Sequence, residues 1–297
     1  MRRIVFIVNK NSVKKQNKSV DDAIAQKFNQ NDNEVKIVYT EYAGHAEVLS
    51  KEAIQNGTDV IVAVGGDGTV NEVATPIINS GVILGIIPMG SGNGLARHLG
   101  IPRNIDKAIE LIKNFNTTII DTCTVDNKPF ISIAGVGFDA YVAEKFSKGT
   151  RRGFLGYFSI VANEYISYKS EKYKLSFSGG EIMEVEALFI AFANSNQFGY
   201  NTTIAPHATL NDGLMDICII KKPEIYKLPL IANLLLLRKL EMSPLVKIIK
   251  TSELNISRTR PGIVNIDGEA IMFDKDISVK INPLSLKIII NPDVSKV

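Results

Sequence analysis

At 297 residues, the chain is long enough for one large domain or two ordinary ones. Its apolar content of 45% and charged content of 22% are those of an ordinary soluble globule, and a net charge of +3 is too small to argue for a nucleic-acid partner. Two cysteines without a CxxC motif exclude a cysteine-held metal, and three scattered histidines argue against a histidine cluster.

The first 113 residues alternate short apolar runs, typical of buried strands, with stretches whose apolar residues recur at helical spacing. This alternation predicts a parallel, three-layer α/β unit. The expected strands are 4–8, 35–39, 59–64 and 84–87, and the expected helices are 20–29, 41–55, 72–79, 95–99 and 105–113.

The third of these strands runs into a glycine-dense turn, Gly65-Gly66-Asp67-Gly68-Thr69, before the helix-forming residues Asn71 and Glu72. Three glycines around one aspartate let the backbone fold tightly and approach a ligand closely. Amide N–H groups at the start of a helix favour an anion, typically phosphate. A plain strand-to-helix turn is the alternative, but it needs fewer glycines, so the pattern favours a phosphate site.

A second turn of the same kind, Gly90-Ser91-Gly92-Asn93-Gly94, follows the fourth strand. Ligands of parallel sheets bind beyond the carboxyl ends of the strands. Small polar residues occupy four such ends: Asn9, Thr40, Gly65–Thr69 and Gly90–Asn93. The sequence therefore predicts a nucleotide or phosphate site at this edge, and the absence of GxxxxGK[ST] shows that it is not of the Walker type.

Short strands dominate the remainder of the chain, which predicts an antiparallel β domain of sandwich or barrel type. We expect an α/β domain over residues 1–122 and a β-sandwich domain over 123–297, whose C-terminal tail can return to the first domain, with the active site in the cleft between the domains. The expected strands are 117–124, 129–134, 173–177, 184–193, 215–221, 252–257, 263–266, 277–281 and 286–290, and two helix-like segments cover 140–169 and 225–250.

Two acidic motifs in this half each have two interpretations. Asp267 and Glu269 flank Gly268, as at the tip of a surface hairpin, but a carboxylate here could also take a proton or orient a metal. Asp212 precedes Gly213, which predicts a turn, or a site where one carboxylate and nearby carbonyls hold magnesium or calcium. The residues alone leave both questions open.

The segment from Lys221 to Lys250 combines ten mostly apolar residues, 228–237, with seven basic and two acidic ones. Ten residues are too few to span a bilayer. Basic charges beside an apolar helix suit an anionic membrane surface, although a core helix with solvated lysines explains the pattern equally well.

The two glycine turns together resemble the diacylglycerol kinase catalytic family, in particular soluble bacterial lipid kinases that include sphingosine-kinase-like members. The resemblance rests on Gly65–Val73 followed by Pro88–Asn93, and it continues through Gly135–Asp139, Asp212–Leu214 and Asp267–Glu269. It covers essentially the whole chain. It implies transfer of the γ-phosphate of ATP to a lipid hydroxyl, with the nucleotide in the α/β domain and Mg²⁺ as the metal.

The resemblance also implies roles for individual residues. Glu269 matches the proposed general base of the bacterial members, with Asp267 as its acidic partner, whereas in sphingosine kinases the residue matching Asp67 is the favoured base. Asp121 matches a further active-site carboxylate, and the Asp212 loop is similar to a structural magnesium site that uses the carbonyls of Thr209 and Leu214. The ATP contacts implied by the resemblance are Asn9, Thr40, Gly65, Gly66, Asp67, Gly68, Thr69, Asn71 and Ser91.

One departure concerns the acceptor. Diacylglycerol kinases of this family usually carry an aspartate directly after the second motif, where this chain has Gly94, and sphingosine kinases also lack an acid there. Diacylglycerol, a sphingoid base and another long-chain alcohol therefore all stay open as acceptors.

We thus expect an ATP- and Mg²⁺-dependent lipid kinase that works in the cytoplasm, peripherally at the inner membrane surface, because no secretory segment precedes it. No nucleic-acid partner and no membrane span are expected, and a homodimer is allowed. Two alternatives remain: a soluble-substrate kinase of the NAD kinase or phosphofructokinase type, and a non-catalytic lipid or nucleotide sensor.

Overall fold

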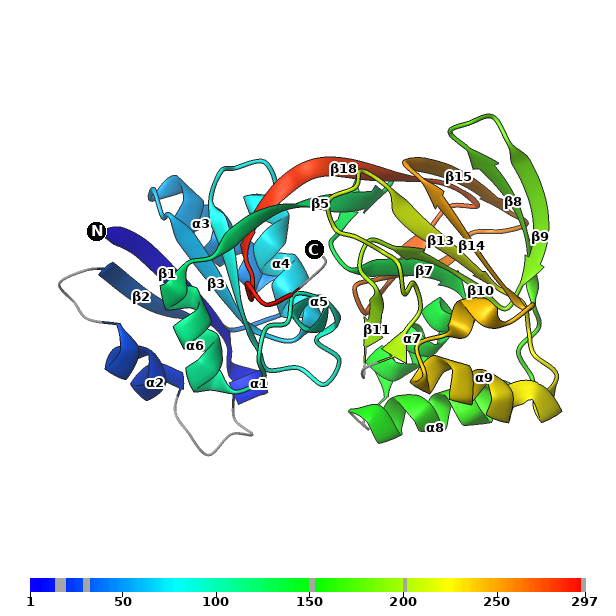
Figure 1. The fold of residues 1–297 in the computed structure, drawn as a ribbon, viewed down its shortest axis with the longest axis horizontal. Helices are drawn as coiled ribbons and strands as arrows, with labels where there is room; N and C mark the ends of the chain where they lie inside the picture. Colours follow the sequence, from blue (N-terminus) through cyan, green and yellow to red (C-terminus); the bar gives the residue numbers. More distant parts are fainter. Residues whose placement is uncertain (14–19, 29–32, 150–152, 200–201, 295–297) are drawn as a thin grey trace. The chain divides into compact units, whose positions relative to one another are not determined.

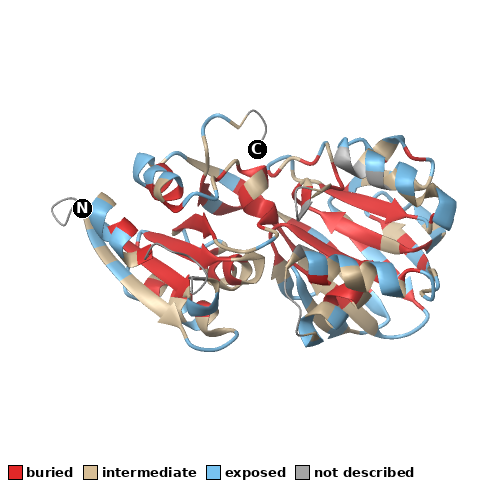
Figure 2. Ribbon diagram, turned by 90° about the horizontal axis from the view of Figure 1, so that it is seen from below, coloured by how far each residue is buried: buried red, intermediate tan, exposed pale blue. Residues whose placement is uncertain are grey.

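The computed structural model describes residues 1–13, 20–28, 33–149, 153–199 and 202–294. It divides into two compact units, Met1–Thr122 with Pro283–Val297, and Cys123–Asn282 (Figure 1). Buried residues line the strands of each unit (Figure 2).

The first unit is an α/β sandwich built on parallel strands. Its elements are β1 (Arg2–Asn9), α1 (Lys10–Val13), α2 (Val20–Lys27), β2 (Asn33–Thr40), α3 (His45–Gln55), β3 (Val60–Gly65), α4 (Asp67–Ile77), β4 (Ile83–Pro88), α5 (Gly94–His98) and α6 (Ile105–Asn114). The strand order is β2-β1-β3-β4, all parallel, and the C-terminal half of β18 (Asp276–Ile289) adds a further parallel strand beside β4. Strands β3 and β4 are buried along their whole length, which is why their sequences are uninterrupted apolar runs.

The helices of this unit form two layers. Helices α2 and α6 pack on each other, and α3 and α4 pack on each other. The chain runs from β1 outward to β2 and later from β3 outward to β4 in the opposite direction. Because crossovers between parallel strands are right-handed, connections running in opposite directions place their helices on opposite faces of the sheet.

The second unit is an antiparallel β-sandwich with helices on the outside of one sheet. Its elements are β5 (Thr117–Val125, which begins in the first unit), β6 (Lys128–Phe130), β7 (Ile133–Gly137), α7 (Phe138–Lys148), α8 (Phe154–Glu164), β8 (Glu171–Phe177), β9 (Ile182–Ala187), β10 (Phe189–Ala193), β11 (Gln197–Gly199), β12 (Thr202–Thr203), β13 (Met215–Ile220), the 3-10 helix η1 (Ile225–Lys227), α9 (Leu228–Leu236), the 3-10 helix η2 (Leu240–Met242), β14 (Val246–Thr251), β15 (Glu253–Arg258), β16 (Gly262–Ile266) and β17 (Glu269–Phe273).

Two sheets enclose the core of this unit. One has the order β18-β15-β8-β9, with the hairpin of β5 and β6 joined to β18, and the other has the order β14-β13-β10-β7-β16-β17. Side chains from both sheets, among them Tyr173, Leu254, Phe192 and Ile217, make one continuous apolar cluster between them. An α/β unit followed by a β-sandwich confirms the predicted fold class.

Several predicted elements need correction. Residues 184–193 form two strands, because the chain passes from one sheet to the other at Leu188. The segment 140–169 holds two helices, and 225–250 ends in strand β14, not in helix. Helix α4 begins at Asp67, five residues earlier than expected, so the first glycine turn is itself the start of the helix.

Candidate active site

The carboxyl ends of β1 and β3 lie at the point where the sheet's connections diverge. Ligands of open α/β sheets bind in the crevice at such a switch point. Asn9 ends β1, and its Nδ2 donates to Oγ1 of Thr69 in the first turn of α4, at 2.9 Å. The Asn9 Oδ1 accepts the N–H of Asn11 at 3.0 Å, which fixes the orientation of the side chain. Two residues predicted from separate strand ends are therefore joined.

The two glycine turns touch through their backbones. The N–H of Met89 donates to the Gly65 carbonyl at 2.7 Å. A Cβ added at Gly90 would come within 2.6 Å of the Gly66 Cα, and one added at Gly66 would lie 3.2 Å from the Gly90 Cα. The close approach of the turns therefore requires glycine at Gly90, and it leaves less than ordinary contact space for a side chain at Gly66.

Asp67 fastens the first turn to the second. Its Oδ2 accepts the N–H of Asn93 at 2.8 Å and its Oδ1 accepts the N–H of Gly94 at 2.7 Å, at the start of α5. Burial raises the pKa of the Asp67 carboxyl, while these two N–H groups and the Arg97 charge act to lower it. The carboxylate therefore stabilises the geometry of both turns together.

The second turn is also held from within. Asn93 adopts a left-handed conformation, with φ of 54°, and its side chain closes a ring with Gly90: Oδ1 accepts the Gly90 N–H at 2.9 Å, and Nδ2 donates to the Gly90 carbonyl at 2.7 Å. Arg97 donates from Nε to the Gly92 carbonyl at 2.9 Å. The loop between β4 and α5 is consequently preorganised.

The other predicted nucleotide contacts of this unit lie around these turns in the chain. Thr40 ends β2 and is half-buried, Gly68 and Asn71 belong to the first two turns of α4, and Ser91 is exposed in the second glycine turn. Their roles in binding stay predictions.

Glu72 was predicted only as a helix former, but it has a specific structural role. Its carboxylate accepts the N–H groups of Gly44 at 3.0 Å and Ala46 at 3.1 Å, at the start of α3. A carboxylate near a helix N-terminus is favourable. Its partners are more than 25 residues away in the chain, so no local pattern could have indicated this contact.

Asp121 lies on β5 within the first unit and is fully buried. Its Oδ1 accepts the N–H of Leu284 at 2.7 Å, and the neighbouring Thr122 hydroxyl lies 2.8 Å from that of Ser285. Leu284 has a φ of 46°, which a leucine rarely adopts, so this carboxylate secures an irregular point of β18. The structure gives Asp121 this structural role, and its catalytic role stays a prediction.

In the second unit, Asp267 and Glu269 form the predicted hairpin tip between β16 and β17, but they differ in environment. Asp267 is buried, and its carboxylate accepts three consecutive N–H groups, from Ile131 at 2.8 Å, Ser132 at 3.0 Å and Ile133 at 2.9 Å. Glu269 is exposed at the first position of β17. Asp267 thus holds the hairpin in place, and Glu269 is an exposed residue beside it.

A buried carboxylate missed by the sequence interpretation lies behind this hairpin. Asp139, at the start of α7, accepts Nδ2 of Asn265 at 2.6 Å and the Tyr157 hydroxyl at 3.0 Å. Burial raises its pKa, and both hydrogen bonds oppose that rise. It connects β16 with α7 and α8.

A lysine ammonium group lies beside the carboxylate of the Asp212 loop. Lys250 Nζ lies 2.6 Å from Asp212 Oδ2 and 3.8 Å from Asp216 Oδ2, and Asp216 pairs with Lys250 across β13 and β14. Burial opposes ionisation of Asp212, but Lys250 and the Leu214 N–H lower its pKa overall. Thr209 and Leu214 are half-buried beside it in the chain. In this structure an ammonium group, not an open ligand set, faces the carboxylate, and metal binding here stays a prediction.

Among the residues that the structure describes, no helix is long and apolar enough to cross a membrane. Nor do three or more His, Cys, Asp or Glu side chains converge there on a point that could hold a metal ion.

Comparison with protein families gives two matches that together cover most of the chain. Residues 3–125 match the diacylglycerol kinase catalytic domain, and residues 132–290 match the YegS C-terminal NAD kinase beta sandwich-like domain. A diacylglycerol kinase of Bacillus subtilis is 30% identical over 278 residues, which is 91% of this chain and 90% of that protein. A probable YegS-like lipid kinase of Citrobacter koseri is 29% identical over 269 residues, covering 88% and 87% of the two chains.

Solved structures share the fold over nearly the whole length. A putative diacylglycerol kinase from Bacillus anthracis superposes with a TM-score of 0.79 at 22% identity, covering 99% of this chain and 98% of its own. An NAD kinase from Archaeoglobus fulgidus in complex with ATP superposes with a TM-score of 0.53 at 15% identity, covering 99% and 95%.

Proposed function

This chain belongs to the family of diacylglycerol kinases and YegS-like lipid kinases, and from that premise we propose that it transfers the γ-phosphate of ATP, with Mg²⁺, to a lipid hydroxyl. Membership makes the chain a kinase, so the non-catalytic sensor is set aside. The observation that carries the proposal is that Asp67, in the first glycine turn, accepts two backbone N–H groups of the second turn. The Asn9–Thr69 hydrogen bond lies in the same first turn.

The first unit supplies the proposed nucleotide site. The close approach of Gly66 and Gly90 packs the two turns together, and the start of α4 offers N–H groups to an anion. The Asp67 oxygens, which accept the N–H groups of Asn93 and Gly94, are of the hard type that suits Mg²⁺ or its water ligands. When bound, Mg²⁺ would neutralise the phosphate charges, which is its usual contribution to phosphoryl transfer.

Glu269 is the better candidate for the general base. A base must reach the acceptor hydroxyl and exchange its proton with solvent, and Glu269 is exposed. Asp67 has a backbone N–H on each oxygen, and its removal would dismantle the turns. We therefore assign proton removal to Glu269, positioned by the Asp267 network, and turn geometry to Asp67.

The acceptor is a long-chain lipid alcohol, with a sphingoid base and diacylglycerol as the leading candidates. The Gly94 N–H is held by Asp67, so this position contributes a backbone contact within the turn and no carboxylate of its own. An acceptor that needs an acidic contact at that position loses it here.

The proposal is tested by offering radiolabelled ATP and Mg²⁺ to the purified protein with vesicles that contain diacylglycerol, a sphingoid base or monoacylglycerol. We expect one lipid class to be labelled well above a Glu269→Gln control that remains folded. Labelling of none of these lipids would refute the proposal.

The soluble-substrate alternative has its own arm in this panel. The fold is shared with an NAD kinase, so NAD without vesicles is the matched acceptor. Transfer to NAD and to no lipid would replace the proposed function with this one.

A further inference from the structure

Helices α8 and α9 are apolar almost throughout, yet neither is enclosed by the protein. Their sequences are FLGYFSIVANE and LPLIANLLL, with one charged residue in the first and none in the second. None of the described side chains of α9 is buried. A helix that is apolar on all sides normally lies in a core or against a membrane, so the solvent-facing position of these two helices needs a partner.

Helices α8 and α9 pack on the same buried cluster. Tyr157 and Ile160 of α8 and Leu228 of α9 pack against the same buried cluster, which includes Phe138 and Leu188. The segment after α8 is tied to the segment before η1, because the Tyr165 hydroxyl donates to the Pro223 carbonyl at 2.5 Å and Lys222 Nζ donates to the Tyr168 carbonyl at 2.6 Å. They therefore form one surface.

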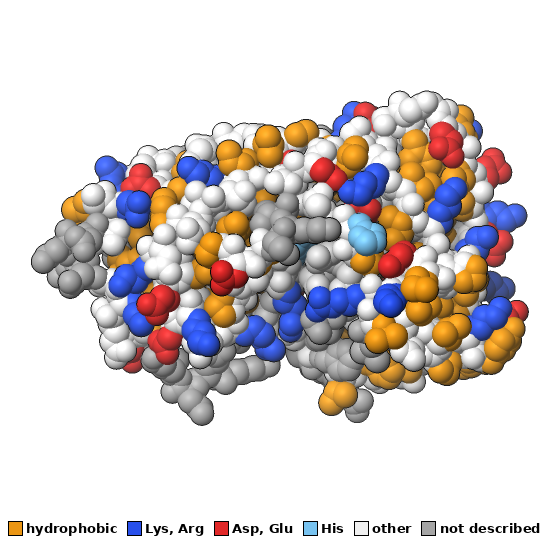
Figure 3. Space-filling view, in the orientation of Figure 1, with side chains coloured by type: hydrophobic (Ala, Val, Ile, Leu, Met, Phe, Trp, Pro, Cys, Tyr) orange, Lys and Arg blue, Asp and Glu red, His pale blue; other side chains and the backbone are white. Residues whose placement is uncertain are grey.

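Large apolar side chains point outward from that surface. In Figure 3, hydrophobic side chains gather over the region where Figure 1 labels α8 and α9. The exposed members, which we call the α8–α9 face, are Leu155, Phe158, Ile166, Ile225, Tyr226, Leu230 and Leu237. Exposed apolar side chains that gather in one patch mark interaction sites in soluble proteins.

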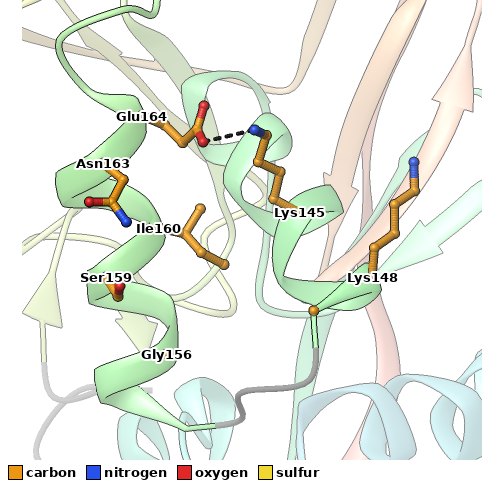
Figure 4. A pocket seen from close by; sticks show the side chains of 8 residues that line it. Lys145, Lys148, Gly156, Ser159, Ile160, Asn163 and Glu164 are labelled. Atoms are coloured by element: carbon orange, nitrogen blue, oxygen red, sulfur yellow. Dashed lines mark hydrogen bonds and ion pairs between the residues drawn. The ribbon is translucent and has the colours of Figure 1, made fainter.

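A hollow of about 470 Å³ lies between α7 and α8. Ser159, Ile160 and Asn163 line it from α8, Ile160 extends toward α7, and Lys145 reaches Glu164 at 2.8 Å (Figure 4). Ser159 follows Leu155 by four residues, so the two share one side of the helix. The α8–α9 face therefore borders this hollow.

Cations lie at both ends of α9. Residues 221–242 hold five basic and two acidic side chains, an excess equal to the net +3 of the whole chain. Lys222 and Lys227 precede the helix, where Lys222 donates to the Tyr168 carbonyl and Lys227 pairs with Glu224 at 2.9 Å. Exposed Arg238 and Lys239 follow it. An apolar helix of nine residues is too short to span a bilayer, and basic groups at its ends complement an anionic lipid surface.

We propose that the α8–α9 face is a docking surface for an anionic phospholipid bilayer, into whose interface its apolar side chains insert while the flanking cations contact lipid headgroups. This inference rests on the proposed function in one respect: a bilayer is where a lipid acceptor would be presented. Its chemistry is that of an interfacial helix that lies in the plane of the membrane.

The test is co-sedimentation of the full-length protein with phosphatidylglycerol vesicles and, separately, with phosphatidylcholine vesicles. Leu155→Glu and Leu230→Glu should each weaken binding to phosphatidylglycerol by about tenfold or more, because each removes one buried leucine side chain from the bilayer. The matched control is Ile182→Glu on β9, since Ile182 and Leu230 are both 61% exposed.

Two lysine variants test the contribution of charge to vesicle binding. Lys239→Gln should weaken binding at low salt and lose its effect at high salt, and Lys174→Gln, also exposed but on β8, should change nothing. The urea unfolding midpoint should be equal in Leu230→Glu and the native protein, which shows that the variant is folded.

Two results would overturn the proposal, and one would support it. Equal binding by Leu230→Glu and Ile182→Glu would overturn the proposal. So would a change from dimer to monomer in Leu230→Glu with vesicle binding unaltered, because the face would then be an interface between copies. Vesicle binding that depends on the face supports the proposal even if no lipid is phosphorylated, a result that would refute only the proposed function.

Discussion

Asp67 Oδ1 accepts the backbone N–H of Gly94 at 2.7 Å, so a carboxylate from one glycine turn holds the first residue of the helix that follows the other. The two residues are 27 positions apart. This contact makes two separate motifs into one rigid cradle at the carboxyl edge of the parallel sheet.

Asp67→Asn should reduce phosphoryl transfer by about 10²-fold or more, because one amide nitrogen would face a backbone N–H and the turns would separate. Steady-state kinetics measure this. Asp59→Asn is the matched control: Asp59 also accepts a backbone N–H, from Arg3 at 2.8 Å, just before the start of β3. Equal loss in both variants would contradict the assignment.

Asn9 and Thr69 should behave as a coupled pair. Asn9→Ala and Thr69→Val each remove the same hydrogen bond, so the double variant should raise the KM for ATP little more than either single one. The double-mutant cycle should give a coupling of about 0.5–1.5 kcal/mol. Strictly additive effects would show that the contact does not contribute to nucleotide binding.

Asp267 and Glu269 should separate into a stability residue and an activity residue. Asp267→Ala leaves three buried N–H groups without an acceptor and should lower the free energy of unfolding by about 3 kcal/mol or more. Glu269→Gln should change stability by less than about 0.5 kcal/mol and turnover by about 10²-fold or more. Urea unfolding and steady-state kinetics on the same samples measure both effects. Full activity in Glu269→Gln would exclude Glu269 as the base.

The fold and the site were predictable to different degrees. The confirmed fold class follows from local signals, namely alternating strands and helices and then short strands. The strand β14 escaped prediction, because Val246–Thr251 is apolar and basic like the 221–250 segment as a whole and is set by pairing with β13. Likewise Leu188 lies inside one apolar run, and only the sheet pairing shows that the chain changes sheets there.

The candidate site shows the same limit. The glycine turns can be recognised from the sequence by their composition. The acceptor roles of Asp67, Glu72 and Asp267, in contrast, depend on backbone groups distant in the chain. Residue types indicated where chemistry could occur, and only the three-dimensional contacts distinguish Asp67 and Asp267, which hold backbone, from the exposed Glu269.

His98 should make the first unit sensitive to acid. Burial lowers its pKa to about 4, below the 6.5 of a free histidine. The unfolded chain therefore takes a proton first, and stability present above pH 6.5 should fall as the pH drops toward 4, by up to about 1.4 kcal/mol per pH unit. His98→Gln should flatten this slope in urea midpoints measured across that window; an unchanged slope would assign it to other groups.

Lys250 should substitute for a metal at the Asp212 loop. We expect EDTA to leave the unfolding midpoint of the native protein unchanged. Lys250→Met should lower stability by roughly 2 kcal/mol, because Asp216 is buried and Lys250 is partly exposed. Lys247→Met on the same strand is the control, since its ammonium faces the Met183 sulphur. Destabilisation by EDTA would instead support the predicted magnesium.

The most direct measurement of the central claim is the amount of lipid phosphate and of ADP formed in one reaction with ATP, Mg²⁺ and acceptor-containing vesicles. The account predicts equal amounts of the two products from the native protein, and neither product above background from Glu269→Gln or Asp67→Asn. ADP without lipid phosphate, or lipid phosphate undiminished in Glu269→Gln and Asp67→Asn, would contradict it.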